Sequence, residues 1–313
     1  MAKSAWELID LRVLCAVARR ASFTAAATDL GISTAYVTKR IAHLERALGT
    51  TLFLRTTRQV GITPQGEGVC AWARKVLDAA DELDQAAAQS RGALVGTLKV
   101  STSHRLGSLH IAPVLARLRQ AHPGLDVWLE LVDRRVDLIA EGFDIDIRVG
   151  EVHEPHLVAH KVAASSRILC AAPGYLQRRG DPASLADLAQ HDCLLFRDRD
   201  RPYTTLRLQG PHGDESVRVA GPMGSNQSDV VRRWAEEGLG ITLLSRWDLA
   251  EALRAGRLVP VLPLYRQAAD IYAVMPTRAS LSAKLQVCLQ FLREHLATGP
   301  CALDLDAPGG SGR

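Results

Sequence analysis

Two short segments near the start of the chain constrain its fold more than any other feature. Ser22 precedes an alanine-rich apolar stretch that ends at Gly31, and Ser33 precedes a second stretch that ends at Gly49. Serine accepts hydrogen bonds from the free amides at the start of a helix, and glycine adopts the left-handed backbone that ends one. The sequence therefore predicts two consecutive helices joined by a tight turn at Gly31.

The second of these helices, residues 34–48, is predicted to have two distinct faces. Its apolar residues recur at helical spacing and predict a buried face: Val37, Ile41, Leu44 and Leu48. Small residues in the preceding helix permit a close approach of the pair, as in a helix-turn-helix. The outer face carries donors and one aromatic ring that could enter a DNA major groove: Tyr36, Lys39, Arg40 and His43. Taken alone, that face could equally be an ordinary charged surface in contact with solvent. The flanking segments decide between this interpretation and DNA binding.

The segment after the second helix favours DNA. Residues 52–62 predict two short strands around a basic tip, the arrangement of a wing, which places Arg55 and Arg58 against phosphates or in a minor groove. An amphipathic helix is predicted before them, over residues 6–20. Within residues 1–62, nine Lys and Arg outnumber four Asp and Glu, whereas the whole chain has a net charge of only +4. This concentration of positive charge favours a polyanionic partner.

Residues 22–66, SFTAAATDLGISTAYVTKRIAHLERALGTTLFLRTTRQVGITPQG, resemble the winged helix-turn-helix of the LysR-type transcriptional regulators. The resemblance implies contacts with bases and phosphates from Ser33, Thr34, Thr38, Lys39, Arg55 and Arg58. Two positions depart from the family pattern, because Thr34 stands where glutamine is common and Tyr36 stands where a small residue is usual. Tyr36 is included among the candidate DNA-binding residues, where it either packs on a thymine methyl or a sugar or simply covers the helix surface.

A long helix is predicted from Pro64 to residue 92, because Thr63 caps its start and proline is favoured in the first helical turn. Apolar residues recur along it in a heptad pattern: Val69, Ala73, Val76, Ala80, Leu83 and Ala87. They indicate a close helix contact, either antiparallel in a dimer or onto the first helix of the chain. The resemblance implies dimerisation here, so we expect a homodimer or homotetramer on double-stranded DNA with dyad symmetry.

Strands alternate with helices from residue 96 onward. The predicted order is strand 98–101, helix 106–121, strand 125–132, helix 136–141 and strand 145–149. This order predicts a mainly parallel sheet covered by helices. A second unit of the same kind is predicted to begin near residue 166, with strands 167–171, 193–196 and 239–244. In the resembling family, the last strand and helix, residues 271–275 and 280–296, return to complete the first lobe.

The predicted fold class is α plus α/β, and 313 residues are enough for several domains. Residues 1–63 form the winged helix-turn-helix, 64–92 the linker and dimerisation helix, and 93–301 a two-lobed effector domain like that of periplasmic solute-binding proteins. Lobe 1 comprises about residues 93–163 plus 268–301, and lobe 2 about residues 164–267. Residues 302–313 are predicted to be a flexible tail because they are rich in glycine.

Ligands of such sheets collect at the carboxyl ends of the strands. The candidate effector-binding residues at these ends are Thr102, Ser103, His104, Asp133, Arg148, Phe196, Ser225 and Asn226. Thr102 and Ser103, like Ser225 and Asn226, stand at predicted helix starts, where free amides favour an anion such as a small carboxylate. The same residues also fit simple helix caps.

Other classes of protein find less support. The sequence contains no G-x-S-x-G, no P-loop and no complete G-x-G-x-x-G, so we expect no enzyme, no catalytic residue and no cofactor. His153, His156 and His160 lie close in sequence, but only Glu154 could complete a ligand set, and no metal site is predicted. The six cysteines are scattered without a C-x-x-C pair and are interpreted as buried thiols, and nothing singles out two redox partners.

The alternatives are a solute-binding protein without a DNA function and a metal- or redox-responsive regulator. A solute-binding protein needs an export signal, and residues 1–10 lack an apolar signal core. No run of apolar residues is long enough for a membrane helix, so no membrane partner is expected. We therefore expect a cytoplasmic, DNA-binding transcriptional regulator controlled by a small-molecule effector.

Overall fold

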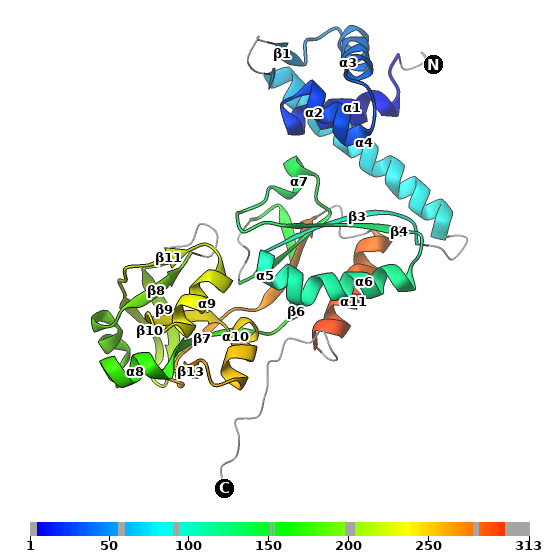
Figure 1. Cartoon of the computed structure of the whole chain (residues 1–313). Helices are drawn as coiled ribbons and strands as arrows, with labels where there is room; N and C mark the ends of the chain where they lie inside the picture. Colours follow the sequence, from blue (N-terminus) through cyan, green and yellow to red (C-terminus); the bar gives the residue numbers. More distant parts are fainter. Residues whose placement is uncertain are drawn as a thin grey trace. The chain divides into compact units, whose positions relative to one another are not determined.

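A computed structural model describes residues 5–55, 60–89, 94–150, 152, 154–197, 204–277 and 282–297 (Figure 1). The chain forms two compact units, Met1–Gly96 and Thr97–Arg313, and each is described by itself. The predicted flexible tail, residues 302–313, lies outside the described residues.

Three helices open the first unit: α1 (Leu8–Arg20), α2 (Phe23–Leu30) and α3 (Thr34–Leu48). The predicted caps are present, since the Ser22 hydroxyl accepts from the amide of Ala25 and the Ser33 hydroxyl accepts from the amide of Tyr36. Gly31 ends α2 with a left-handed backbone, φ +65°. Helices α2 and α3 therefore begin and end where the local chemistry predicts, whereas α1 begins at Leu8 rather than at residue 6.

The wing and the linker helix follow. Strands β1 (Phe53–Arg55) and β2 (Val60–Ile62) pair antiparallel, and α4 spans Pro64–Gln89. Gly66, in the first turn of α4, lies so close to β1 that a Cβ atom there would come within 2.3 Å of the Leu52 carbonyl oxygen. Only glycine permits this approach, which fixes the start of α4 against the wing.

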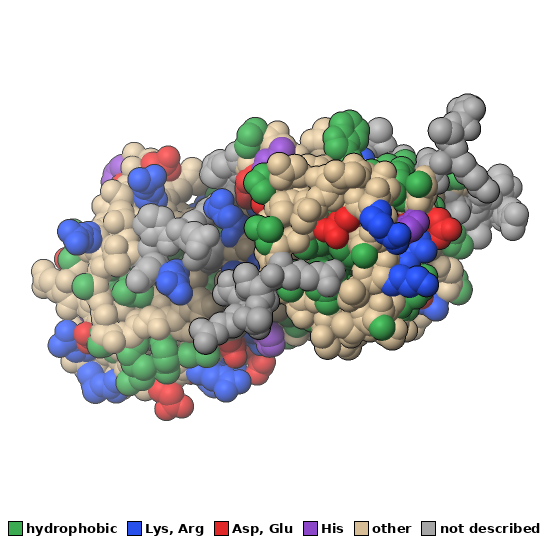
Figure 2. All heavy atoms as spheres, turned by 90° about the horizontal axis from the view of Figure 1, so that it is seen from above, with side chains coloured by type: hydrophobic (Ala, Val, Ile, Leu, Met, Phe, Trp, Pro, Cys, Tyr) green, Lys and Arg blue, Asp and Glu red, His purple; other side chains and the backbone are tan. Residues whose placement is uncertain are grey.

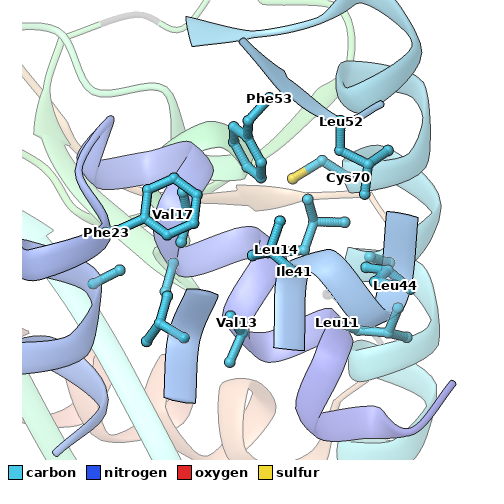
Figure 3. Close-up of a cluster of buried hydrophobic side chains, with 14 of the residues drawn as sticks. Leu11, Val13, Leu14, Val17, Phe23, Ile41, Leu44, Leu52, Phe53 and Cys70 are labelled. Atoms are coloured by element: carbon cyan, nitrogen blue, oxygen red, sulfur yellow. The ribbon is translucent and has the colours of Figure 1, made fainter. Parts of the chain in front are cut away.

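The core of the first unit lies between α1, α2, α3 and the start of α4 (Figure 3). Its buried side chains include Leu11, Leu14, Val17, Ile41, Leu44 and Leu52. Phe23 and Phe53 meet edge to face, with ring centroids 5.9 Å apart. Because each such side chain contributes roughly 1.5–3 kcal/mol when fully buried, this core holds the three helices in a fixed arrangement.

The first lobe of the second unit is a five-stranded sheet in the order β4-β3-β5-β15-β6. Its strands are β3 (Gly96–Thr102), β4 (Leu125–Leu131), β5 (Ile145–Val149), β6 (Leu157–Ala163) and β15 (Ile271–Pro276). Its helices are α5 (His104–Leu106), α6 (Ala112–Ala121), α7 (Leu138–Glu141) and α11 (Ala283–Ala297), with a π-helical turn, η1 (Gly107–Ile111), joining α5 to α6. The single helix predicted over 106–121 is thus longer and contains a π-turn.

The second lobe contains an eight-stranded sheet, with the path β10-β9-β14-β7-β12-β8-β11 and β13 paired to β7. The strands are β7 (Ser166–Ala171), β8 (Cys193–Phe196), β9 (Thr205–Gly210), β10 (Gly213–Arg218), β11 (Gly224–Ser225), β12 (Ile241–Ser245), β13 (Val259–Pro260) and β14 (Arg266–Ala268). The helices are α8 (Pro173–Arg179), the 3-10 helix η2 (Leu185–Gln190), α9 (Ser228–Glu236) and α10 (Arg246–Arg254). The β9–β10 hairpin is absent from the sequence-based prediction.

Each of the two sheets contains more antiparallel strand pairs than the sequence predicts. β3 and β5 are parallel, as are β8 and β12, but β15 is antiparallel to both β5 and β6, and β14 is antiparallel to β7. The reason is the path of the chain, which leaves the first lobe through β6 and β7 and returns through β14 and β15 in the opposite direction. Hydrogen bonds from the amide of Ala269 to the Ser165 carbonyl (2.9 Å) and from the amide of Ser165 to Asp270 Oδ1 (3.0 Å) join the two crossings.

The surface carries both signs of charge. In the face shown in Figure 2, Lys and Arg side chains are spread widely, and several lie next to Asp or Glu. Within the described part of the chain, no helix combines the length and the apolar character that crossing a membrane requires.

Candidate DNA-binding surface and ligand pocket

The exposed side of α3 carries most of the residues predicted to bind DNA. Thr34, Tyr36 and Lys39 are exposed, and Thr38 is half-buried. Ser33 is exposed as well, but its hydroxyl is already engaged as the cap of α3. The helix therefore presents a hydroxyl, an aromatic ring and an ammonium group on one accessible surface, the set of groups that can contact base edges and phosphates.

Arg40 and His43 make a different contact from the one the sequence suggested. Arg40 Nε lies 2.5 Å from Asp10 Oδ1, and His43 Nδ1 lies 3.3 Å from Asp10 Oδ2. Asp10 belongs to α1 and is completely buried. Arg40 also pairs with Glu7 at 2.9 Å, so these two side chains of α3 hold the helix against α1.

Sequence reasoning did not identify Asp10, although a signal was present. Asp10, Leu14 and Val17 follow each other at spacings of four and three, which places the carboxylate on the buried face of α1. A buried carboxylate requires a cationic or donor partner. The Arg40 guanidinium in turn lies 5.9 Å from the centroid of the Tyr36 ring, so the buried pair also supports the exposed ring of Tyr36.

The wing residues are described only in part. Arg55 ends β1, but its side chain, like the whole of Arg58, lies outside the described residues. Their predicted contacts with phosphate stay predictions.

Helix α4 has an inner and an outer apolar face. Cys70 and Ala73 are buried in the core of the first unit. Three large apolar side chains lie exposed along the opposite side, Trp72 (67% exposed), Val76 (36%) and Leu83 (70%), and are called the α4 stripe below. Of the predicted heptad positions, Ala73 therefore packs within the chain, whereas Val76 and Leu83 face outward.

A pocket lies between the two lobes of the second unit, with about 500 Å³ of empty space that includes its open mouth. Residues at or just beyond the carboxyl ends of six strands line it: Ser103 after β3, Asp133 after β4, Val149 in β5, Phe196 in β8, Asn226 after β11 and Ser245 in β12. The pocket thus lies at the strand ends where the sequence predicts an effector site, and the binding of an effector there stays a prediction.

Four of the eight candidate effector residues line this pocket: Ser103, Asp133, Phe196 and Asn226. Thr102 is completely buried, and its hydroxyl donates to the Ile147 carbonyl at 2.9 Å. The Ser225 hydroxyl accepts from the amide of Gln227, and the exposed His104 contributes its backbone amide to Asp133. Thr102, His104 and Ser225 are thus not among the lining residues, and their hydrogen bonds hold neighbouring parts of the backbone and Asp133 in place.

Arg148 does not belong to the lining either. Its Nε lies 2.5 Å from the buried Asp146, and its Nη1 donates to Glu154 at 2.7 Å. Burial alone would lower the pKa of Arg148, but the neighbouring carboxylates raise it above its ordinary value, and the guanidinium stays charged. Val149, the next residue along β5, faces the pocket instead.

Sequence reasoning missed the charged part of the lining. Arg167, at the start of β7, is 9% exposed and donates through Nη1 to Gln267 at 3.0 Å, with its guanidinium 5.8 Å from the centroid of the Phe196 ring. Arg105 and Asp248 pair at 2.8 Å. Arg167 lies at the start of a strand, Arg105 on the short helix α5 and Asp248 in the first turn of α10, and a search restricted to the carboxyl ends of strands selects none of these positions.

Contacts across the pocket join the two lobes. Gln227 Nε2 donates to Asp133 Oδ2 at 2.7 Å, and the Arg105–Asp248 ion pair also runs from lobe to lobe. The rings of His110 and Trp247 meet edge to face at 5.4 Å. The amino ends of α9 and α10 lie at the same pocket, and the side chains at their N-cap positions, Gln227 and Ser245, make no capping hydrogen bond to the helix amides.

Two protein families match the chain: "Bacterial regulatory helix-turn-helix protein, lysR family" over residues 8–67 and "LysR substrate binding domain" over residues 91–297. The chain belongs to the LysR family of transcriptional regulators. This LysR-type regulator is 41% identical to the HTH-type transcriptional regulator DmlR of Escherichia coli K12, over 93% of this chain and 94% of DmlR. It is 40% identical to the E. coli K12 transcriptional activator TtdR, over 92% and 94% of the two chains.

Solved structures agree with this assignment. Full-length AphB of Vibrio cholerae, a virulence activator, matches with a TM-score of 0.60 and 27% identity over 93% of this chain and 100% of that one. CrgA of Neisseria meningitidis, a LysR-type transcriptional regulator, matches with a TM-score of 0.59 and 26% identity over 93% and 99%. The predicted combination of a helix-turn-helix with a two-lobed effector domain is confirmed.

The general function predicted from the sequence is also confirmed. The protein is a DNA-binding transcriptional regulator with an effector-binding domain, and the alternative of a solute-binding protein without a DNA function is wrong, because the helix-turn-helix family covers residues 8–67. The histidines weighed as metal ligands include His153, which lies outside the described residues. Among the described residues, no group of three or more metal-ligating side chains comes together.

Proposed function

We propose that this regulator binds a dyad operator as a homodimer or homotetramer and responds to a small anion held between its lobes. The observation that carries the effector class is the convergence of Arg167 and the starts of α9 and α10 on one pocket. Free amides at a helix start and the positive end of the helix both favour negative charge.

The chemistry of the lining supports a small carboxylate. Ser103, Asn226 and Ser245 offer hydroxyl and amide donors, and Arg167 offers a planar guanidinium that can hold both oxygens of one carboxylate. Asp133 and Asp248 also face the pocket. Across it, Asp133 accepts a hydrogen bond from Gln227 and Asp248 pairs with Arg105. The two carboxylates therefore repel an incoming anion less than their charge suggests.

For DNA, we propose contacts from Ser33, Thr34, Tyr36, Thr38 and Lys39 on α3 and from Arg55 and Arg58 on the wing. The exposure of Thr34, Tyr36 and Lys39 supports this set, since groups that read a groove must reach it from the surface. The resemblance of residues 22–66 to the family, now joined by the match over residues 8–67, supports the remaining positions.

For assembly, we propose that the α4 stripe packs against the same stripe of a second copy. Trp72 and Leu83 are more than 60% exposed, and burying two such side chains from each copy removes a large apolar surface from water. Lys75 lies over the Trp72 ring, with Nζ 3.7 Å from the centroid, and can keep its charge at the rim.

We propose further that the protein is not an enzyme and acts in the cytoplasm, where a bacterial chromosome is accessible. The related proteins are named as transcriptional regulators, which supports a binding function rather than catalysis. We propose no cofactor.

A thermal-shift screen of small mono- and dicarboxylates tests the effector proposal. We expect at least one acid to raise the melting temperature of the wild type and not that of Arg167→Ala, because a ligand that binds only the folded state stabilises it. Arg233→Ala is the matched control, since Arg233 lies exposed on α9 outside the lining. If no carboxylate shifts the wild type but a cationic or neutral solute does, the anion proposal is wrong.

A further inference from the structure

We infer that Cys15 and Cys70 form a reactive dithiol, which hydroperoxides oxidise to a disulfide between α1 and α4, and that this bond changes the affinity for DNA. The two sulfur atoms lie 3.8 Å apart, although the residues are 55 positions apart in sequence. No motif in the sequence indicates this pair.

The pair lies within the first unit, beside the DNA-binding surface. Cys70 is 2% exposed and points into the core formed by α1, α2 and α3 (Figure 3). Cys15, on α1, is half-buried and is the more accessible member of the pair, so we expect a hydroperoxide to approach the two sulfurs from the Cys15 side. Cys170, Cys193 and Cys288 are buried in the second unit, and Cys193 donates its thiol to the Leu188 carbonyl.

The surroundings of the pair favour a thiolate on one sulfur. The hydrogen bond between the two sulfurs and the positive charge of Arg74, one turn further along α4, lower the pKa of Cys70 to about 7, while the pKa of Cys15 is raised. Burial raises the pKa of Cys193 and of Cys288 to about 12. Since the thiolate is the nucleophile, Cys70 is the sulfur that attacks.

Oxidation proceeds in two balanced steps. The Cys70 thiolate attacks one oxygen of hydrogen peroxide, the O–O bond breaks, and Cys70 becomes a sulfenic acid while the leaving hydroxide takes a proton to give water. The Cys15 sulfur then attacks the sulfenic sulfur, the S–O bond breaks, and the Cys15 proton leaves with the hydroxyl as a second water. Two electrons pass from the two thiols to one peroxide.

The bond must alter the geometry of the DNA-binding unit. A disulfide brings two sulfurs to about 2.05 Å, so they approach by roughly 1.8 Å. Rotation of the two side chains can supply part of this approach, and because the core is closely packed we expect a small shift of α1 against α4 to supply the rest. Helix α1 holds Arg40 of α3 through Asp10, and α4 carries the exposed α4 stripe, so the shift reaches both functional surfaces.

Peptide mapping of the full-length protein tests the site itself. The reduced protein is treated with a small excess of hydrogen peroxide, digested without reductant and examined by mass spectrometry. We expect a peptide pair linked through Cys15 and Cys70, released by dithiothreitol, in the wild type and in the control Cys193→Ser. In Cys15→Ser, we expect a Cys70 sulfenic acid that a dimedone probe traps. Absence of the linked pair from the oxidised wild type overturns the proposal.

A DNA-binding measurement tests the consequence. Fluorescence anisotropy with a duplex from the region upstream of its own gene gives the Kd of the reduced and oxidised protein. We expect oxidation to change the Kd at least threefold in the wild type and in Cys193→Ser, reversibly with dithiothreitol, and to leave Cys70→Ser unchanged. A linked pair without any change in Kd overturns the regulatory claim. The mapping result does not depend on the operator or the effector, so failure of the proposed function is seen separately.

Discussion

Asp10 Oδ1 lies 2.5 Å from Arg40 Nε, so an ion pair with a completely buried carboxylate joins helix α1 to α3, the second helix of the helix-turn-helix. A buried charge is tolerated only when it is paired, and removing one partner leaves the other desolvated. The orientation of α3 therefore depends on a residue outside it.

Replacing this carboxylate is expected to destabilise the protein and to weaken DNA binding together. For Asp10→Ala, we expect a loss of about 1–3 kcal/mol in the free energy of unfolding, because Arg40 retains Glu7 but loses its buried partner, and the amide of Glu7 loses its acceptor at the start of α1. Urea unfolding followed by circular dichroism measures it. The control is Asp29→Ala, whose partners Arg19 and Arg20 are more exposed and whose loss costs about 0–1 kcal/mol. Equal losses in the two variants contradict the buried-pair argument.

Lys39 is expected to act through charge. If Lys39 contacts a phosphate, Lys39→Ala is expected to bind every DNA sequence more weakly. The slope of log K against the logarithm of the salt concentration is then expected to become less steep by about one. Gel shifts at several salt concentrations, with specific and unrelated duplexes, measure both. Arg46→Ala, at the far end of α3, is the control. If Lys39→Ala changes the preference at a single operator position only, Lys39 reads a base.

The contact between Gln227 and Asp133 is expected to hold the lobes together when no effector is bound. For Gln227→Ala, we expect faster hydrogen–deuterium exchange at the starts of α5 and α9, because the 2.7 Å hydrogen bond across the pocket is lost. Exchange at the β9–β10 hairpin serves as the internal reference. Unchanged exchange at both helix starts means that the other contacts across the pocket, Arg105–Asp248 and His110–Trp247, hold the lobes together without Gln227.

Ionisation of Cys70 is expected near neutral pH. The folded-state pKa is lowered to about 7, so the thiolate forms as the pH rises through that value and is lost as the pH falls below it. Titration of the ultraviolet thiolate absorbance is expected to show a step at about pH 7 in the wild type and in Cys193→Ser but not in Cys70→Ser. Peroxide sensitivity should follow the same curve. A first step well above pH 8 in the wild type removes Cys70 as the attacking sulfur.

The α4 stripe gives an assembly prediction. For Leu83→Glu, we expect a shift toward smaller species in light scattering at micromolar protein, because a carboxylate in an apolar contact between copies is costly to bury. Gln65→Glu, at an exposed position in the first turn of the same helix, adds the same charge without this effect. An unchanged mass distribution for Leu83→Glu places the contact between copies elsewhere.

Local chemistry made the first unit predictable. Ser22, Ser33, Gly31 and Gly49 act within a few residues of their own position, and such contacts can be inferred from spacing alone. The pairing of Asp10 with Arg40 depends on how two helices pack, and its only trace in the sequence is a charged residue at an apolar position.

The ligand pocket was harder to predict for the same reason. Side chains alternate between the faces of a strand, so Asp146 and Arg148 share one face of β5 and pair, while Val149 takes the other face and lines the pocket. This alternation of side chains along β5 excludes Arg148 from the candidate effector-binding residues. Arg105, Arg167 and Asp248 reach the pocket through the packing of the lobes, which no local pattern records.

The two crossings between the lobes restrict what an effector can do. A single connection would let one lobe rotate about it, whereas we expect two antiparallel crossings, bonded to each other through Ser165, Ala269 and Asp270, to limit the lobes mainly to bending toward and away from each other. We therefore expect a molecule in the pocket to change mainly the angle between the two lobes. If the proposed effector binds there, we expect its presence to reach the other copies in an oligomer as this one change of angle.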